Sequence, residues 1–191
     1  GAFYREQQQR VEAFAAAVHS GEITGSTGKR FERVIQIGIG GSDLGPRALY
    51  LALLHYLDGQ GRVPYMAASF ISNVDPDDGG AGLRDIDPER TLFVLVSKSG
   101  TTQETLTNER FVVESLEKAG VAGLKPRKHI VAVTSQTSPL AKSSDYLDAF
   151  YIDDYIGGRY SGTSAVGTTI LSLSLGTDIV AEFLSGAHEA D

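Results

Sequence analysis

Five short apolar segments, each bounded by turn residues, constrain the fold of this chain most strongly. These candidate strands cover residues 33–37, 63–71, 91–96, 129–134 and 149–152. Helical patterns cover residues 3–18, 43–57, about 103–118, 162–175 and 177–184, with a short helix expected within 135–142. Continuous apolar strands that alternate with helices are typical of a parallel sheet covered on both faces. The sequence therefore predicts a doubly wound α/β fold.

Two strand orders are common for such sheets, because crossovers between parallel strands are right-handed. They are the flavodoxin-like order 2-1-3-4-5 and a longer order found in dinucleotide-binding domains. Five strands favour the flavodoxin-like order. The chain has no internal repeat and no linker-like change of composition, so we expect residues 1–191 to form a single domain.

Charge and composition exclude several classes of protein. The chain has 17 Lys and Arg against 24 Asp and Glu, a net charge of −7, and no basic run, which argues against a nucleic-acid partner. It has no cysteine, which excludes disulfides and thiolate chemistry and fits a cytoplasmic location. No apolar run reaches the roughly 18–20 residues that span a bilayer, so we expect no membrane insertion. Because the chain starts with Gly1 and its only methionine is Met66, we expect a fragment.

The first candidate site is a glycine-rich turn, residues 38–46, between a strand and a helix. Such a turn brings backbone N–H groups close to a ligand at the positive end of the helix dipole, which suits an anion. The alternative to anion binding is that these glycines are needed only for packing between the strand and the helix. Asp43 replaces the third glycine of a dinucleotide fingerprint, Leu44 replaces the last glycine of a nucleophile elbow, and the Gly-Lys-Ser/Thr of a P-loop is absent.

The second candidate site, residues 97–104, also lies between a strand and a helix. Its four hydroxyl groups and one lysine match a phosphate monoester, which needs several hydrogen bonds and some neutralisation of charge. A capped helix is the alternative and would explain Thr101 or Thr102 together with Glu104. Capping does not explain the three residues 97–99.

The two turns follow the first and third candidate strands. In the order 2-1-3-4-5 these strands are neighbours, and the crevice between their carboxyl ends is the switch point where ligands bind in open α/β sheets. We therefore expect both turns to face one phosphorylated small molecule.

A third candidate is Arg159, which follows Gly157 and Gly158 at another turn between a strand and a helix. Its planar, permanently charged guanidinium suits a developing oxyanion. A surface arginine in a loop is the alternative reading.

Other polar residues are expected to have structural or solvent-exposed roles. The four histidines show no paired metal-ligand spacing; they are His19, His55, His129 and His188. Three aspartates at 75, 77 and 78 suggest a calcium loop, but Ile86 occupies the position that needs a glutamate. We therefore expect no metal site.

Three segments, taken in order, resemble the hallmark segments of the phosphoglucose isomerase family. They are residues 37–46, 96–105 and 157–167, and residues 183–188 are also similar. The resemblance implies the first of two sugar-isomerase domains. It also implies interconversion of glucose 6-phosphate and fructose 6-phosphate through a cis-enediol, without a cofactor, in an enzyme that is usually a homodimer.

The resemblance also assigns residue roles. The substrate phosphate would be held by Gly41, Ser42, Ser97, Lys98, Ser99 and Thr102, with Gly40, Thr101, Glu104 and Gly158 in support. Arg159 would stabilise the enediolate. The glutamate base and the histidine and lysine of ring opening would lie beyond Asp191, so we expect this piece to bind substrate without turnover. Gly100 and Gly162 stand where the family often has bulkier residues, which affects the shape of the sugar pocket.

The sequence is compatible with two other functions. A non-catalytic regulator could use the same fold to bind a sugar phosphate, although the basic segment expected of a DNA-binding module is absent. A nicotinamide-dependent oxidoreductase would rest on the glycine turn alone.

Overall fold

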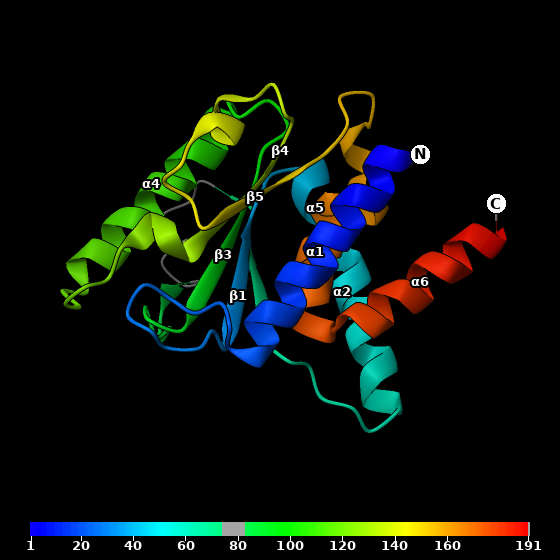
Figure 1. Ribbon diagram of the computed structural model, residues 1–191, viewed down its shortest axis with the longest axis horizontal. Coiled ribbons are helices and arrows are strands. Elements are labelled where there is room, and N and C mark those ends of the chain that lie inside the picture. The colour runs from blue at the N-terminus through cyan, green and yellow to red at the C-terminus, as the bar shows by residue number, and fades with distance from the viewer. Residues whose placement is uncertain (74–82, 191) are drawn as a thin grey trace.

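The computed structural model describes residues 1–73 and 83–190 and shows a five-stranded, fully parallel sheet (Figure 1). The strands are β1 (Arg33–Ile37), β2 (Ala67–Ile71), β3 (Thr91–Val96), β4 (Ile130–Thr134) and β5 (Asp148–Tyr151). Their order is β2-β1-β3-β4-β5. The predicted α/β class and the flavodoxin-like strand order are therefore confirmed. The aspartates of the rejected calcium loop lie outside the described residues.

Helices cover both faces of the sheet. They are α1 (Ala2–Ser20), α2 (Gly41–Gly59), α4 (Gln103–Lys118), α5 (Ala165–Leu175) and α6 (Thr177–Ala190), with short 3-10 helices η1 (Pro126–His129), η2 (Pro139–Lys142) and η3 (Gly158–Thr163). Figure 1 shows α4 on one side of the sheet and α1, α2, α5 and α6 on the other. Along β3, Leu92 and Val94 face the larger helical layer and Phe93 and Leu95 face α4. All four are fully buried, which explains the uninterrupted apolar run.

The predicted strand 63–71 is wrong in its first half. Val63 and Tyr65 are 82% and 59% exposed, and β2 begins only at Ala67. The register explains this difference, because Ala67 pairs with Arg33, the first residue of β1. The backbone N–H of Tyr65 donates instead to the Ser174 carbonyl on α5, at 2.8 Å.

The helix predicted at 43–57 begins earlier, at Gly41, which places Pro46 beyond its first turn. A proline there has no N–H to donate to the carbonyl four residues before it, that of Ser42. The buried Gln36 side chain on β1 replaces this donor, with Nε2 at 2.7 Å from the Ser42 oxygen. The strand thus fixes the start of α2 directly. At the other helix, Ser164 caps α5, which begins at Ala165 rather than at residue 162.

His129 has the structural role expected of an isolated histidine. Its ring is fully buried at the end of η1, just before β4, and lies edge-on to Phe31. Nε2 accepts a hydrogen bond from the Ser26 backbone N–H at 2.9 Å, so the proton resides on Nδ1, which lies 3.2 Å from the Thr91 carbonyl. The neutral ring therefore ties the loop before β1 to β3.

The stability of the fold is expected to fall in weak acid because of His129. Burial lowers the pKa of its ring from the usual 6.5, an effect that the Thr91 carbonyl partly opposes. The unfolded chain then binds a proton more readily than the folded protein. The contribution of the neutral His129 ring to the free energy of unfolding is therefore complete above pH 6.5 and decreases as the pH falls towards the lowered pKa. The free energy of unfolding, measured with urea at several pH values, should decrease with falling pH in the control His55→Gln, which changes an exposed histidine. The decrease should be smaller in His129→Gln. Equal slopes would contradict the assignment.

None of the helices formed by the described residues is long and apolar enough to cross a membrane.

Candidate active site at the carboxyl edge of the sheet

The first two predicted turns leave the sheet side by side. β1 and β3 are hydrogen-bonded neighbours, and Ile37 at the end of β1 pairs with Leu95 near the end of β3. The turn after β1 leads into α2 and the turn after β3 leads into α4. These two helices lie on opposite faces of the sheet (Figure 1), so the chain diverges at this point. This is the topological switch point of the sheet, the place where ligands bind in open α/β folds.

The turn after β1 has a backbone that favours glycine at two positions. Gly40, the residue that caps α2, has φ +60°, a conformation that favours glycine, and the helix has no side-chain cap. Gly38 also requires glycine, because a Cβ there would lie 2.5 Å from the Ser42 carbonyl oxygen. No side chain caps α2. The Ser42 N–H donates to the Ile39 carbonyl at 3.2 Å and the Asp43 N–H to the Gly40 carbonyl at 3.0 Å, so among the described residues the Gly41 N–H is the first amide of α2 without a partner.

Sequence reasoning missed the contribution of Gln36 to this turn. Its side-chain Nε2 donates a hydrogen bond to the Ser42 carbonyl in the first turn of α2. The available signal was a single amide within an apolar strand, together with a proline four residues after Ser42.

In the turn after β3, the hydroxyl groups bond to one another rather than capping α4. Thr102 occupies the cap position, but its side chain makes no cap hydrogen bond. Instead the buried Ser97 hydroxyl donates to Thr102 Oγ1 at 3.2 Å and accepts from the Gly100 N–H at 3.1 Å. The capping alternative therefore does not describe this turn, and the first amides of α4 have no side-chain partner.

The outer part of the same turn faces solvent. Ser99 and Thr101 are exposed, and the Ser99 hydroxyl oxygen accepts hydrogen bonds from the Thr101 N–H and hydroxyl at 3.2 and 3.0 Å. Glu104 is exposed in the first turn of α4, where a carboxylate is favoured by the helix dipole. The outer part of the turn thus exposes two hydroxyl groups and one carboxylate to solvent.

Lys98 has a different immediate role from the one expected. Its ammonium donates to the backbone carbonyls of Asp154 and Ile156, at 2.8 and 3.0 Å. Two of its three N–H groups are therefore engaged with the segment that leads to Arg159.

The third predicted motif packs directly on the first. Gly41 and Gly158 approach so closely that a Cβ on Gly41 would lie 2.3 Å from the Gly158 carbonyl carbon. The Ser161 hydroxyl lies 3.1 Å from the Gly41 carbonyl oxygen and 2.7 Å from that of Gly158. Arg159 is exposed on η3, and no described residue forms an ion pair with it. The backbone that carries Arg159 therefore lies next to the glycine turn.

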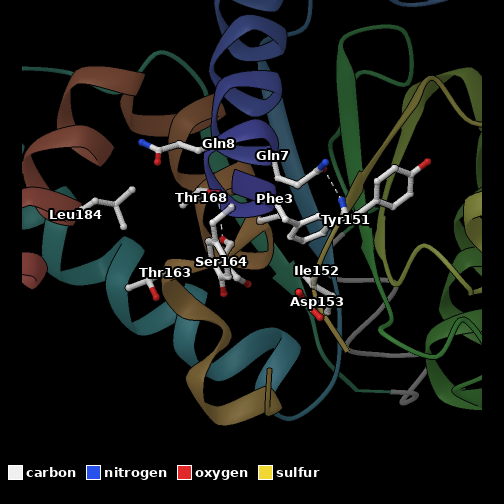
Figure 2. A pocket seen from close by; sticks show the side chains of 12 residues that line it. Phe3, Gln7, Gln8, Tyr151, Ile152, Asp153, Thr163, Ser164, Thr168 and Leu184 are labelled. Carbon is white, nitrogen blue, oxygen red and sulfur yellow. Dashed lines mark hydrogen bonds between the residues drawn. The ribbon is translucent and has the colours of Figure 1, made fainter. Parts of the chain in front are cut away.

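A separate pocket lies behind this motif, between α1, the end of β5 and the start of α5 (Figure 2). Its lining includes Phe3, Gln7, Asp153, Ser164 and Thr168, and contains none of the predicted site residues. Figure 2 shows Gln7 reaching the β5 backbone, where its Oε1 accepts from the Tyr151 N–H at 2.9 Å. The pocket is therefore distinct from the switch point between β1 and β3.

Comparisons with known proteins agree on one family. Residues 3–191 match the family described as Phosphoglucose isomerase. A curated glucose-6-phosphate isomerase from Treponema denticola is 55% identical over 99% of the chain, and one from Borreliella burgdorferi is 43% identical over 99%. The crystal structure of a glucose-6-phosphate isomerase from Chlamydia trachomatis superposes with a TM-score of 0.82 at 40% identity over 96% of the chain. The chain spans only 34%, 35% and 32% of these three proteins, about a third of their length.

Proposed function

The chain belongs to the phosphoglucose isomerase family, and we propose that it supplies the phosphate-binding part of a glucose-6-phosphate isomerase. The whole protein would interconvert glucose 6-phosphate and fructose 6-phosphate without a cofactor. The observation that carries this proposal is that two helix starts without side-chain caps follow the neighbouring strands β1 and β3 at the switch point. A phosphate monoester fits there, because helix N-termini present unpaired N–H groups and a positive dipole end.

In this proposal the phosphate accepts hydrogen bonds from both turns. Gly41 and Ser42 contribute from the start of α2, with Gly40 allowing the close approach of the backbone. The turn after β3 contributes Ser97, Ser99 and Thr102, with Thr101 and Glu104 in support, while Lys98 adds positive charge. A charge-assisted hydrogen bond is worth about twice a neutral one, so several such donors bind a dianion selectively over a neutral hydroxyl.

Arg159 would act at the other end of the substrate. Proton transfer between C1 and C2 places negative charge on an enediolate, and a fixed guanidinium stabilises charge that develops in the transition state. Gly158 supports this role because its contact with Gly41 fixes the distance between the arginine loop and the phosphate turn.

We expect the 191-residue chain to bind fructose 6-phosphate without isomerising it. The three motifs supply donors and cations, whereas proton transfer also needs a positioned general base. Calorimetry should show binding of fructose 6-phosphate and none of fructose, the control that lacks the phosphate. A coupled assay should show no isomerisation. Failure to bind the ester would contradict the proposed phosphate site. Turnover that persists after repurification would contradict the expectation that this chain does not supply the general base.

We further propose that residues 1–191 form one sugar-isomerase domain and that the whole protein is a cytoplasmic homodimer. The usual state of the family supports the dimer. Light scattering on the full-length protein tests the oligomeric state.

A further inference from the structure

The side chain of Lys98 connects two motifs that are far apart in sequence. Its ammonium bonds to the carbonyls of Asp154 and Ile156, which lie just before the Gly157-Gly158-Arg159 turn. A cation placed to neutralise a bound phosphate would be expected to leave its donors free for that phosphate. Here the structure uses two of the three donors within the protein.

The bonded carbonyls belong to residues 152–158, here called the crossing segment. It begins after β5, at the edge of the sheet, and ends at Gly158, which contacts Gly41 at the start of α2. Because β3 and β4 separate β5 from β1, the segment must cross the carboxyl edge of both strands. Lys98, at the end of β3, bonds to the segment along this crossing.

The backbone that carries Lys98 is itself firmly held. The Lys98 carbonyl accepts from the Ser135 N–H at 3.0 Å, and the neighbouring Ser97 carbonyl accepts from the Thr134 hydroxyl at 2.7 Å. Both partners lie at or just after the end of β4. The ammonium is therefore supported by two central strands of the sheet. The crossing segment is tied to β4 at its start, where the Ile152 N–H donates to the Thr134 carbonyl at 3.0 Å, whereas further along the Ile156 N–H donates to the Asp153 carbonyl of the same segment, at 3.1 Å.

We propose that Lys98 is a positioning residue that fixes the crossing segment and thereby holds Arg159 beside the phosphate turn. This inference rests on the proposed function and deepens it, because it assigns the lysine mainly to the arginine loop. Any electrostatic effect of Lys98 on the phosphate adds to this role and does not depend on Arg159.

Amide hydrogen exchange tests the positioning directly and needs no ligand. Lys98→Met keeps most of the side-chain length and removes the donors. We expect exchange of the Ile156 and Tyr160 amides to accelerate about tenfold, since local opening costs less without these hydrogen bonds. Lys128→Met is the matched control, because Lys128 also donates to two backbone carbonyls, those of Ser144 and Tyr146. It should leave exchange at residues 156 and 160 unchanged, and unchanged exchange in Lys98→Met would overturn the proposal.

A double-mutant cycle separates positioning from direct phosphate contact. The affinity for 6-phosphogluconate, a phosphate ester whose C1 carboxylate places negative charge at the end of the substrate assigned to Arg159, is measured for Lys98→Met in the native chain and again in an Arg159→Met background. If Lys98 acts through Arg159, the loss in the native chain should exceed the loss in the Arg159→Met background by about tenfold, as expected for coupled residues. Equal losses in the two backgrounds would overturn the proposal. Lys128→Met should bind as the native chain does.

Different results would contradict the proposed phosphate-binding function and the positioning role of Lys98. If the native chain does not bind fructose 6-phosphate, the proposed function fails, and exchange at the Ile156 and Tyr160 amides alone decides the role of Lys98. If the native chain binds and the exchange and coupling effects are absent, the positioning role fails and the phosphate site stands.

Discussion

Gly41→Ala is expected to weaken binding of fructose 6-phosphate by about tenfold or more, the loss of one charge-assisted hydrogen bond or its equivalent. The added Cβ would lie 2.3 Å from the carbonyl carbon of Gly158 and 2.5 Å from its oxygen. These are backbone atoms, so the contact can be relieved only by moving α2 or the arginine loop. Either shift separates the groups that are proposed to bind the two ends of the substrate.

Gly45→Ala is the matched control for this variant. Gly45 lies one turn further along the same helix and also faces η3, but its Cβ would lie 3.8 Å from the nearest atom, Gly162 Cα, which is an ordinary contact. We expect Gly45→Ala to bind as the native chain does. Calorimetry measures both affinities, and circular dichroism checks that both variants are folded. Equal affinities for the two variants would show that the close approach of the loops is not needed for binding.

Gly100→Ala is expected to reduce the free energy of unfolding by about 2–4 kcal/mol, the sum of left-handed backbone strain and overpacking. Gly100 has φ +67°, and its Cβ would lie 2.1 Å from Ser138 Oγ. That hydroxyl cannot move freely because it accepts the Leu140 N–H and caps η2. The substitution should also weaken sugar-phosphate binding, because the Gly100 N–H bonds to Ser97.

Gly120→Ala separates the two causes of this loss. Gly120 has a nearly identical φ of +65°, and nothing lies within 4 Å of the position of its Cβ. It should lose only the backbone contribution, about 1–2 kcal/mol. Urea unfolding of both variants measures the difference. Equal losses would mean that the contact with Ser138 is unimportant.

The parallel α/β class could be predicted from sequence because parallel strands are buried on both faces. Residues 92–96 form an uninterrupted apolar run, and the structure buries every one of them. Apolar character alone failed at Val63, which is apolar but exposed, because no neighbouring strand extends far enough to pair with it. Strand limits depend on the partner strand, which a local pattern does not contain.

The placement of the candidate site followed from the strand order, but its internal contacts did not. The two turns meet because β1 and β3 are neighbours. The acceptors of Lys98 lie more than fifty residues later in the chain, and the Gly41–Gly158 contact joins α2 to η3. Neither leaves a periodic signal in the sequence. The position of Lys98 between serines therefore suggested a free cation, although two of its three N–H groups donate to backbone carbonyls of the protein.

Backbone amide spectra recorded during a titration with glucose 6-phosphate test the central claim most directly. We expect the largest shifts at Gly41 and Ser42 and in the first turn of α4, residues 103–105, because these amides begin the two uncapped helices. Glucose should leave them unchanged. Shifts confined to residues around the Figure 2 pocket, or equal shifts with glucose, would contradict the claim that these two turns bind the phosphate.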